Sequence, residues 1–226
     1  NTDPYQPIER QLGITRAVLE VLDRFNHPMS IITKSALIAR DADILGAMAR
    51  RGLAKAYVSI TTLDRALARA MEPRAATPER RLWAVAELAK AGVPVGVGFA
   101  PAIPGLNDHE MEAVLERAAQ AGAASAMFVA LRLPLEIKDL FREWLESERP
   151  DRAKRVMSLV RQMRGGKDYD TQWGSRMTGQ GVYAELIAKR FAVATARLGL
   201  NLERRPLRLD LFKVPPVEKP QMELFG

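Results

Sequence analysis

The sequence predicts an α/β fold in which helices cover a parallel sheet, and three observations lead to this prediction. Short apolar runs alternate with segments of helical period from residue 8 to about residue 150. The apolar runs carry hydrophobic side chains at consecutive positions, which is typical of strands buried on both faces. The 226 residues are 47% hydrophobic and 27% charged, a balance that can fill a sizeable core.

Four segments have the composition of such strands. They are Met29–Thr33, Ala56–Ile60, Val93–Phe99 and Ala126–Leu131. Helical segments separate them, which predicts repeated βα units of about 30 residues joined by right-handed crossovers. Since parallel strands point the same way, their carboxyl ends are expected at one edge of the sheet, where folds of this kind bind ligands.

The helices follow from apolar spacing and from capping residues. Apolar residues three or four positions apart predict a single helix over about residues 8–25. A later helix has Thr77 as its N-cap and Pro78 at its first position. Asn107 and Glu110 form an approximate capping box before a further helix.

The chain divides into three parts by pattern. Residues 1–150 are expected to form the βα body. Residues 151–200 are expected to add a helical extension, with helices over about 151–164 and 181–199. Residues 201–226 are proline-rich and aperiodic, which predicts an extended tail.

Composition excludes several classes of protein. The chain has no cysteine, so it contains neither a disulfide framework nor a thiolate metal site. Its two histidines, His27 and His109, stand apart from any ligand-like cluster. No apolar run approaches the roughly 20 residues that span a bilayer, and no secretory signal is visible. We therefore expect a cytoplasmic protein without a membrane partner.

The net charge of +7 arises from residues 151–226, since basic and acidic residues balance in residues 1–150. This asymmetry predicts either that the basic C-terminal third contacts a polyanion such as nucleic acid, or that it serves solubility alone. The basic residues recur at helical spacing and then continue into a loop. They are Arg152, Lys154, Arg155, Arg161, Arg164 and Lys167.

The first residues place polar side chains before a helix. Two X-Pro pairs force an extended or turned backbone at Asp3 and Gln6. Such a junction between a strand and a helix lies on the ligand face of a parallel α/β fold, and it could equally be a plain helix start. Thr2, Asp3 and Gln6 are therefore candidate ligand residues.

Lys34 and Ser59 stand near the ends of two predicted strands. A lysine at the end of an apolar strand requires an anion, because an unpaired buried charge carries a large desolvation cost. The anion is either a bound carboxylate or phosphate, which Ser59 could share, or the side chain of Asp64 or Glu72.

The ordered segments of the chain resemble a known family. They are TDPYQPIE, ITKS, VSITTLD, MEPRAATPERRL, VGVGFAPAIPGLND, LRLPLE and MRGGKDYD. Together they are similar to the radical S-adenosylmethionine (SAM) superfamily, in the branch related to spore photoproduct lyase. The resemblance covers nearly the whole chain in order.

The resemblance implies an incomplete TIM-type βα barrel with parallel strands, followed by C-terminal helices and a tail. In that family a CxxxCxxC loop after the first strand holds a [4Fe–4S] cluster, which binds SAM. An electron donor reduces the cluster, and SAM is cleaved to a 5′-deoxyadenosyl radical that abstracts hydrogen from the substrate. By position, this chain is expected to start at the end of the second strand.

The resemblance also assigns cofactor-binding residues. Thr2 matches a position near the SAM amino group, with Asp3 beside it. Lys34 and Ser59 match positions that hold the SAM carboxylate. Arg74 is a weaker candidate, because its segment could equally be a surface turn. By the family pattern, the backbone over residues 101–105 and 128–130 would flank the adenosine.

The absence of cysteine departs from the family, so this chain alone is expected to be inactive. The full-length protein is expected to be a radical SAM enzyme, with DNA repair or nucleic-acid modification as its setting. The alternative is a non-catalytic module that binds nucleic acid or the sliding clamp.

The last residues carry the clamp prediction. Gln221, Leu224 and Phe225 resemble the bacterial clamp-binding pattern QLxLF, and residues 209–212 form a poorer copy. Short motifs of this kind bind through a few side chains placed in an apolar pocket. The alternative is that Leu224 and Phe225 fold back over a groove of the barrel.

Overall fold

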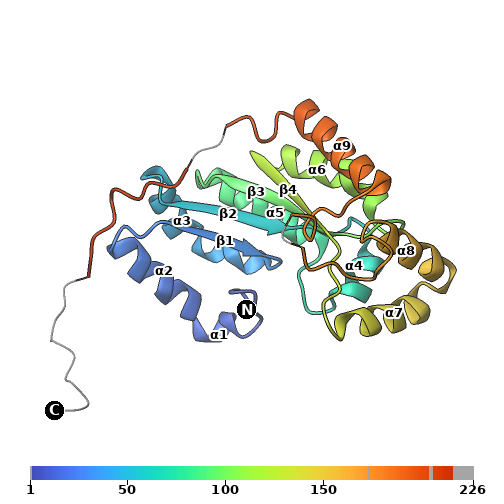
Figure 1. The fold of residues 1–226 in the computed structure, drawn as a ribbon. Helices are drawn as coiled ribbons and strands as arrows, with labels where there is room; N and C mark the ends of the chain where they lie inside the picture. The colour runs from blue at the N-terminus through green and yellow to red at the C-terminus, as the bar shows by residue number, and fades with distance from the viewer. Residues whose placement is uncertain (1, 173, 204–205, 216–226) are drawn as a thin grey trace, which may run out of the picture.

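A computed structural model describes residues 2–172, 174–203 and 206–215. Its centre is one sheet of four parallel strands in the order β1-β2-β3-β4 (Figure 1). The strands are β1 (Met29–Thr33), β2 (Ala54–Ser59), β3 (Val95–Ala102) and β4 (Ser125–Ala130). The α/β prediction is therefore confirmed, with all four strand ends at one edge of the sheet. We call this the carboxyl edge.

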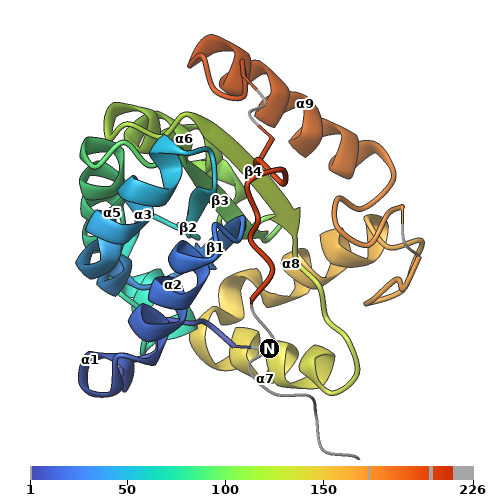
Figure 2. The ribbon, with the colours of Figure 1, turned by 90° about the vertical axis from the view of Figure 1, so that its left-hand side faces the viewer.

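Helices connect the strands and extend beyond them. They are α1 (Glu9–Leu12), α2 (Ile14–Arg24), η1 (Ala36–Asp41), α3 (Ala42–Arg50), α4 (Arg65–Met71), α5 (Pro78–Lys90), η2 (Asp108–Glu110), α6 (Met111–Gln120), α7 (Ile137–Glu148), α8 (Pro150–Gln162) and α9 (Val182–Arg197). Figure 2 shows α3, α5 and α6 side by side on one face of the sheet, as in the outer layer of a βα barrel. None of the helices in the described ranges is long and apolar enough to cross a membrane.

The apolar residues of the sheet and its covering helices form the main core. Val58, Val97 and Leu88 are fully buried there, and Ile187 of α9 belongs to the same cluster. A second cluster joins Leu67 of α4 to α7 and α8. The C-terminal helices therefore pack on the body through buried apolar side chains.

Two local predictions were wrong. The single helix expected over residues 8–25 is divided into α1 and α2 at Gly13, whose φ of 62° is left-handed and suits glycine. The capping box at Asn107 does not form. The Asn107 side chain is fully buried and instead bonds to backbone groups of Ile103, Thr61 and Pro101.

The predicted start of α5 is confirmed. Thr77 caps α5 by accepting a hydrogen bond from the backbone N–H of Arg80, and Pro78 is the first residue of that helix. Residues 206–215 contain no helix or strand. Their backbone bonds to Gly52 and Phe25 at the amino ends of the strands, and the Phe212 ring meets His27 edge-on at 5.4 Å between centroids.

Candidate functional site

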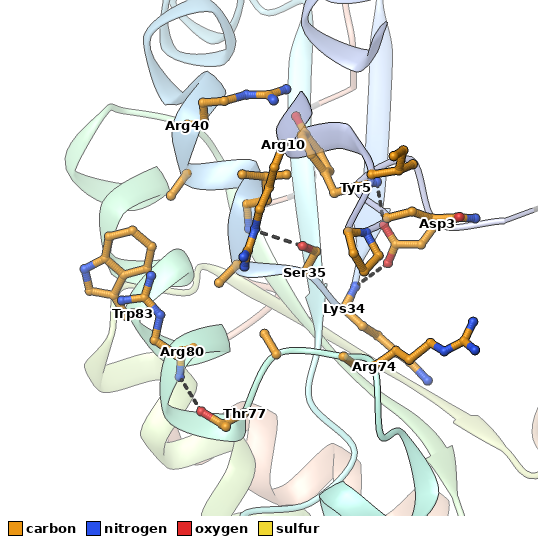
Figure 3. A pocket seen from close by; sticks show the side chains of 18 residues that line it. Asp3, Tyr5, Arg10, Lys34, Ser35, Arg40, Arg74, Thr77, Arg80 and Trp83 are labelled. Carbon is orange, nitrogen blue, oxygen red and sulfur yellow. Dashed lines mark hydrogen bonds between the residues drawn. The ribbon is translucent and has the colours of Figure 1, made fainter. Parts of the chain in front are cut away.

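The candidate site is a cavity of about 1500 Å³ beside the carboxyl edge (Figure 3). The N-terminal segment, η1, the turn after α4 and the first turns of α5 surround it. Five basic side chains and one carboxylate are in its lining: Arg10, Lys34, Arg40, Arg74, Arg80 and Asp3. The cavity is therefore electropositive.

Asp3 ties the N-terminal segment to the end of β1. Its Oδ1 accepts hydrogen bonds from the backbone N–H of Tyr5 at 2.9 Å and from Oγ1 of Thr33 at 2.6 Å. Its Oδ2 accepts from the backbone N–H of Lys34 at 2.7 Å. The carboxylate of Asp3 thus lies against the Lys34 backbone at one wall of the cavity.

Lys34 shares a carboxylate with a buried arginine. Its Nζ pairs with Oε1 of Glu72, whose Oε2 accepts a hydrogen bond from Arg81 at 2.5 Å. Thr61 also donates to Glu72, at 3.0 Å. Burial opposes ionisation of Glu72, but the charges of Arg81 and Lys34 prevail and hold its pKa below the usual value. Of the anions expected for Lys34, the structure therefore shows the side chain of Glu72. Two cations, Lys34 and Arg81, share this one carboxylate.

Arg81 links this network to β2. Its side chain is 2% exposed and donates to the backbone oxygens of Ala76 at 2.7 Å and Ser59 at 3.1 Å. The backbone at the end of β2 is thereby joined through Arg81 and Glu72 to the lysine at the end of β1.

The five predicted cofactor residues do not all meet. Asp3, Lys34 and Arg74 line the cavity. Thr2 is exposed and Ser59 is 5% exposed, and neither is in the lining. Ser59 and Lys34 share the carboxyl edge, since Ser59 is the last residue of β2 and Lys34 directly follows β1. The backbone over 101–105 and 128–130 also lies outside the lining.

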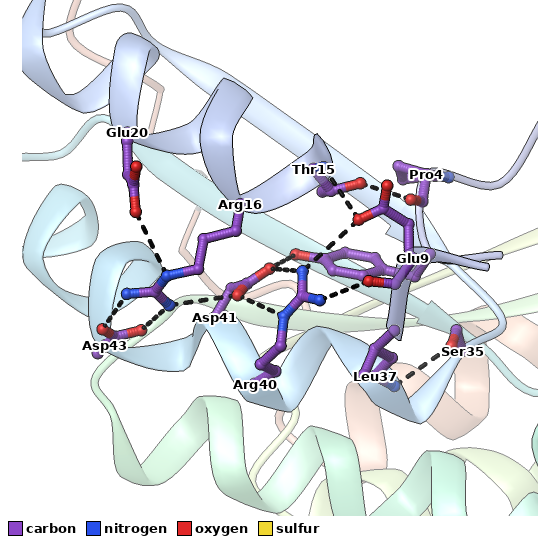
Figure 4. Close-up of polar contacts among 11 residues, drawn as sticks. Pro4, Glu9, Thr15, Arg16, Glu20, Ser35, Leu37, Arg40, Asp41 and Asp43 are labelled. Atoms are coloured by element: carbon purple, nitrogen blue, oxygen red, sulfur yellow. Dashed lines mark hydrogen bonds and ion pairs between the residues drawn. The ribbon is translucent and has the colours of Figure 1, made fainter. Parts of the chain in front are cut away.

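A second network fixes the N-terminal wall (Figure 4). Asp41, whose side chain is fully buried, accepts a hydrogen bond from the Tyr5 hydroxyl at 3.1 Å and pairs with Arg40 at 2.9 Å and Arg16 at 3.3 Å. Arg40 also donates to the backbone oxygen of Glu9 at 2.8 Å. Burial, and then the negative charge of Asp41, raises the pKa of Tyr5.

Sequence reasoning missed several residues of this region. The sequence pattern indicates Glu72 only as an alternative partner of Lys34 and assigns no role to Arg81, Arg10, Arg80 or Trp83. The helical period did carry a signal for Arg81, because it stands three, four and seven positions before the buried Ala84, Val85 and Leu88 and so shares their face of the helix. The cavity itself has no sequence signal, since segments distant in the chain form it.

The predicted basic face of α8 is not continuous. Arg164 is 2% exposed and donates to two backbone oxygens, and Arg161 pairs with Asp168 at 2.8 Å. The clamp-binding residues Gln221, Leu224 and Phe225 lie outside the described residues. The poorer copy over residues 209–212 is partly engaged in the fold, because Leu211 packs against the main core.

No group of three or more metal-ligating side chains occurs among the residues that the structure describes. Together with the absence of cysteine, this means that the residues of this chain do not fit an iron–sulfur cluster. The cavity lining does contain one carboxylate, Asp3, and one lysine ammonium, Lys34.

Comparison with known proteins identifies relatives of the chain. Residues 8–118 match the family model described as the radical SAM superfamily. An uncharacterized protein of Mycobacterium tuberculosis is 28% identical over 208 residues, which cover 91% of this chain and 57% of that protein. An uncharacterized protein of Methanocaldococcus jannaschii is 30% identical over 109 residues, which cover 48% of this chain and 40% of that protein.

Solved structures share the fold. Spore photoproduct lyase complexed with dinucleoside spore photoproduct superposes with a TM-score of 0.58 at 17% identity, over 85% of this chain and 56% of that chain. A variant of the same enzyme gives a TM-score of 0.59 with the same coverage. The fold is therefore the partial barrel of these enzymes. The matched region is 57% of the Mycobacterium tuberculosis protein and 56% of spore photoproduct lyase, little more than half of each.

Proposed function

The chain belongs to the radical SAM superfamily, and on this basis we propose that it forms the SAM-binding part of an enzyme that abstracts hydrogen from its substrate. The observation that carries the proposal is the family match together with the electropositive cavity at the carboxyl edge. When bound, SAM would supply the 5′-deoxyadenosyl radical in proteins of this family.

We assign the amino-acid part of SAM to Asp3 and Lys34. SAM carries an ammonium and a carboxylate on one carbon, so it requires an anion and a cation side by side. Asp3 and Lys34 would supply these two charges, because both line the cavity and a 2.7 Å hydrogen bond holds the Asp3 carboxylate against the Lys34 backbone. Arg74 and Thr2 stand near this pair as further candidates. Ser59 would contribute indirectly, because it is buried at the end of β2 and lies outside the cavity lining.

Glu72 and Arg81 would position Lys34. Two cations on one carboxylate leave an excess of positive charge, so Lys34 can turn to a second carboxylate while Arg81 still neutralises Glu72. If Lys34 exchanged Glu72 for the carboxylate of an anionic ligand, the ligand would gain a cation while Glu72 kept Arg81 as its partner.

The cluster that the family uses would require thiolates from outside these 226 residues, and we derive no step through it. A whole protein of this kind would also require an electron donor. We further propose a cytoplasmic location and a substrate in nucleic acid, as in DNA repair. Support for that substrate comes from the fold shared with a lyase whose solved complex contains a dinucleoside photoproduct.

The test has two parts. Calorimetry would measure SAM binding to the whole gene product that contains this chain and to its Lys34→Met and Asp3→Asn variants. Each variant is expected to bind SAM at least about tenfold more weakly, since a hydrogen bond to a charged group contributes about 1.5–3 kcal/mol. Arg69→Gln removes an exposed charge away from the cavity lining and is the matched control.

The second part is chemical. The whole gene product, reconstituted with iron and sulfide and then reduced, is expected to release 5′-deoxyadenosine from SAM. Unchanged SAM binding in both variants would overturn the site assignment. Absence of 5′-deoxyadenosine from a loaded and reduced protein would overturn the reaction.

A second candidate function is a non-catalytic module that binds nucleic acid. The cavity lining favours it, because its five basic side chains suit a polyanion. Binding of nucleic acid without any 5′-deoxyadenosine production would support the module.

A further inference from the structure

Three exposed arginines from different segments of the chain belong to the cavity lining. Arg10 comes from α1, Arg74 from the turn after α4, and Arg80 from the first turn of α5. In the described part of the chain, no hydrogen bond or ion pair to a protein group engages their guanidinium groups. The other two basic residues of the lining differ, because Lys34 pairs with Glu72 and Arg40 pairs with Asp41.

The lining does not neutralise these arginines. Asp3 is the one carboxylate among the lining residues, and three donors of the protein already occupy its two oxygens. The amino terminus of α5 adds positive potential at Thr77. Several like charges around a hollow repel one another unless an anion enters. The surface therefore suits a ligand that carries more than one negative charge.

An aromatic ring lies beside the arginines. Trp83 is 39% exposed, and the guanidinium carbon of Arg80 lies 4.1 Å from the centroid of its ring (Figure 3). A large exposed indole with a stacked guanidinium offers a flat π surface. Such a surface binds unpaired bases by stacking, whatever their sequence.

We propose that this cavity binds a segment of single-stranded nucleic acid. Arg10, Arg74 and Arg80 contact backbone phosphates, and a base stacks at Trp83. A strand fits better than one nucleotide, because several phosphates of a strand can contact the three arginines of the lining, which come from α1, the turn after α4 and α5. A strand also fits better than a duplex, because the bases of a duplex are already stacked on one another.

This inference rests on the proposed function in one respect. The proposed nucleic-acid substrate is the reason why the protein would bind a strand at this cavity. Binding itself needs neither SAM nor a cluster. The site differs from the predicted basic face of α8, where Arg161 has a carboxylate partner and Arg164 is buried.

The experiment uses the 226-residue chain without cofactors. Fluorescence anisotropy would measure its binding to a labelled single-stranded oligothymidylate at several salt concentrations. The triple variant Arg10→Gln, Arg74→Gln, Arg80→Gln is expected to bind at least about tenfold more weakly at low salt. Its log–log salt slope is expected to fall by about 2, at roughly 0.7 per lost phosphate contact on a single strand.

Trp83→Ala tests the stacking separately. It is expected to weaken binding by about fivefold or more while leaving the salt slope unchanged, because it removes no charge. The matched control is the triple variant Arg152→Gln, Lys154→Gln, Arg155→Gln, which removes the same charge from α8. This control is expected to bind within about twofold of the parent chain. Circular dichroism would verify that each variant is folded.

Three outcomes would overturn the proposal. They are no binding by the parent at low salt, equal losses in the two triple variants, and a duplex that binds more tightly than the single strand with no effect of Trp83→Ala. Each is independent of the proposed reaction, since 5′-deoxyadenosine production is measured on the whole gene product. Strand binding without SAM cleavage would support this surface and count against the reaction.

Discussion

Arg81→Met, at the carboxyl edge, is expected to lower the free energy of unfolding more than Lys34→Met does. The Arg81 side chain is 2% exposed and donates to Glu72, Ala76 and Ser59. Methionine keeps most of the length and apolar volume of arginine but none of the donors. The substitution therefore isolates the polar contribution of the guanidinium.

The magnitude follows from what Arg81→Met leaves behind. The backbone oxygens of Ala76 and Ser59 lose a donor, and a buried unsatisfied acceptor costs about 1–3 kcal/mol. Removal of one partner of a buried ion pair costs about 3–5 kcal/mol. Glu72 retains Lys34 and Thr61, so the loss at this carboxylate falls below that range. With about 1 kcal/mol for each of the two backbone oxygens, we expect about 3–4 kcal/mol in total.

Lys34→Met is the matched comparison. The Lys34 side chain is 35% exposed, and Glu72 would keep the buried Arg81 as its partner. A partly exposed pair contributes little after solvent screening, so the expected loss is about 1 kcal/mol or less. The two variants thus remove one cation each from the same carboxylate with unequal effects.

Urea unfolding followed by circular dichroism would measure both variants. Thermal unfolding gives a second readout, and a loss of 3–4 kcal/mol corresponds to roughly 6–16 °C for a chain of this size. The slope of free energy against urea is expected to stay unchanged, since the fold is the same. A loss below about 1 kcal/mol for Arg81→Met, or equal losses for the two variants, would refute the reasoning.

Three further predictions concern other parts of the fold. Asp41→Asn is expected to lower the free energy of unfolding by about 3 kcal/mol, because two arginines face this fully buried carboxylate; a loss below about 1 kcal/mol in urea would contradict this. Burial, and then the hydrogen bond to Asp108, raises the pKa of Tyr183 from 10.0 to about 12. The stability it contributes is therefore complete below pH 10 and is lost as the pH rises through 12. In an ultraviolet titration, Tyr183→Phe is expected to remove one late-ionising tyrosine, and an unaltered late phase would count against it. Gly96→Ala would place its Cβ 2.4 Å from Cε1 of Tyr57. A loss of about 1–3 kcal/mol in thermal unfolding is expected, and an unchanged melting temperature would mean that Tyr57 yields freely.

Local signals predicted much of the fold. Each of the four strands is predicted from its apolar run, because burial on both faces leaves a pattern that can be recognised over five to seven residues. The start of α5 was predicted from Thr77 and Pro78, because an N-cap and a first-position proline act through the nearest turn alone. Gly13 shows where this fails. A single left-handed residue divided a helix whose apolar period continued across it.

The candidate site was predicted only in part. The sequence predicts that Lys34 needs an anion, because an unpaired charge buried at the end of an apolar strand carries a large desolvation cost. The choice between a ligand and the side chain of Glu72 stayed open in the sequence, because the two residues are 38 positions apart. The sequence predicts that Ser59 and Lys34 lie at the same edge of the sheet, and the structure places both at the carboxyl edge. Ser59, however, is buried outside the cavity lining.

The sequence by itself determined the fold class, the strands, the family resemblance and the lack of cluster ligands, because each is carried by neighbouring residues or by composition. The tertiary structure decided which charges meet. It paired Lys34 with Glu72, buried Arg164 while Arg161 pairs with Asp168, and placed Arg10, Arg74 and Arg80 in the lining of one cavity. Electrostatic energy depends on distance in space, and only the packing of α1, η1 and α5 sets those distances.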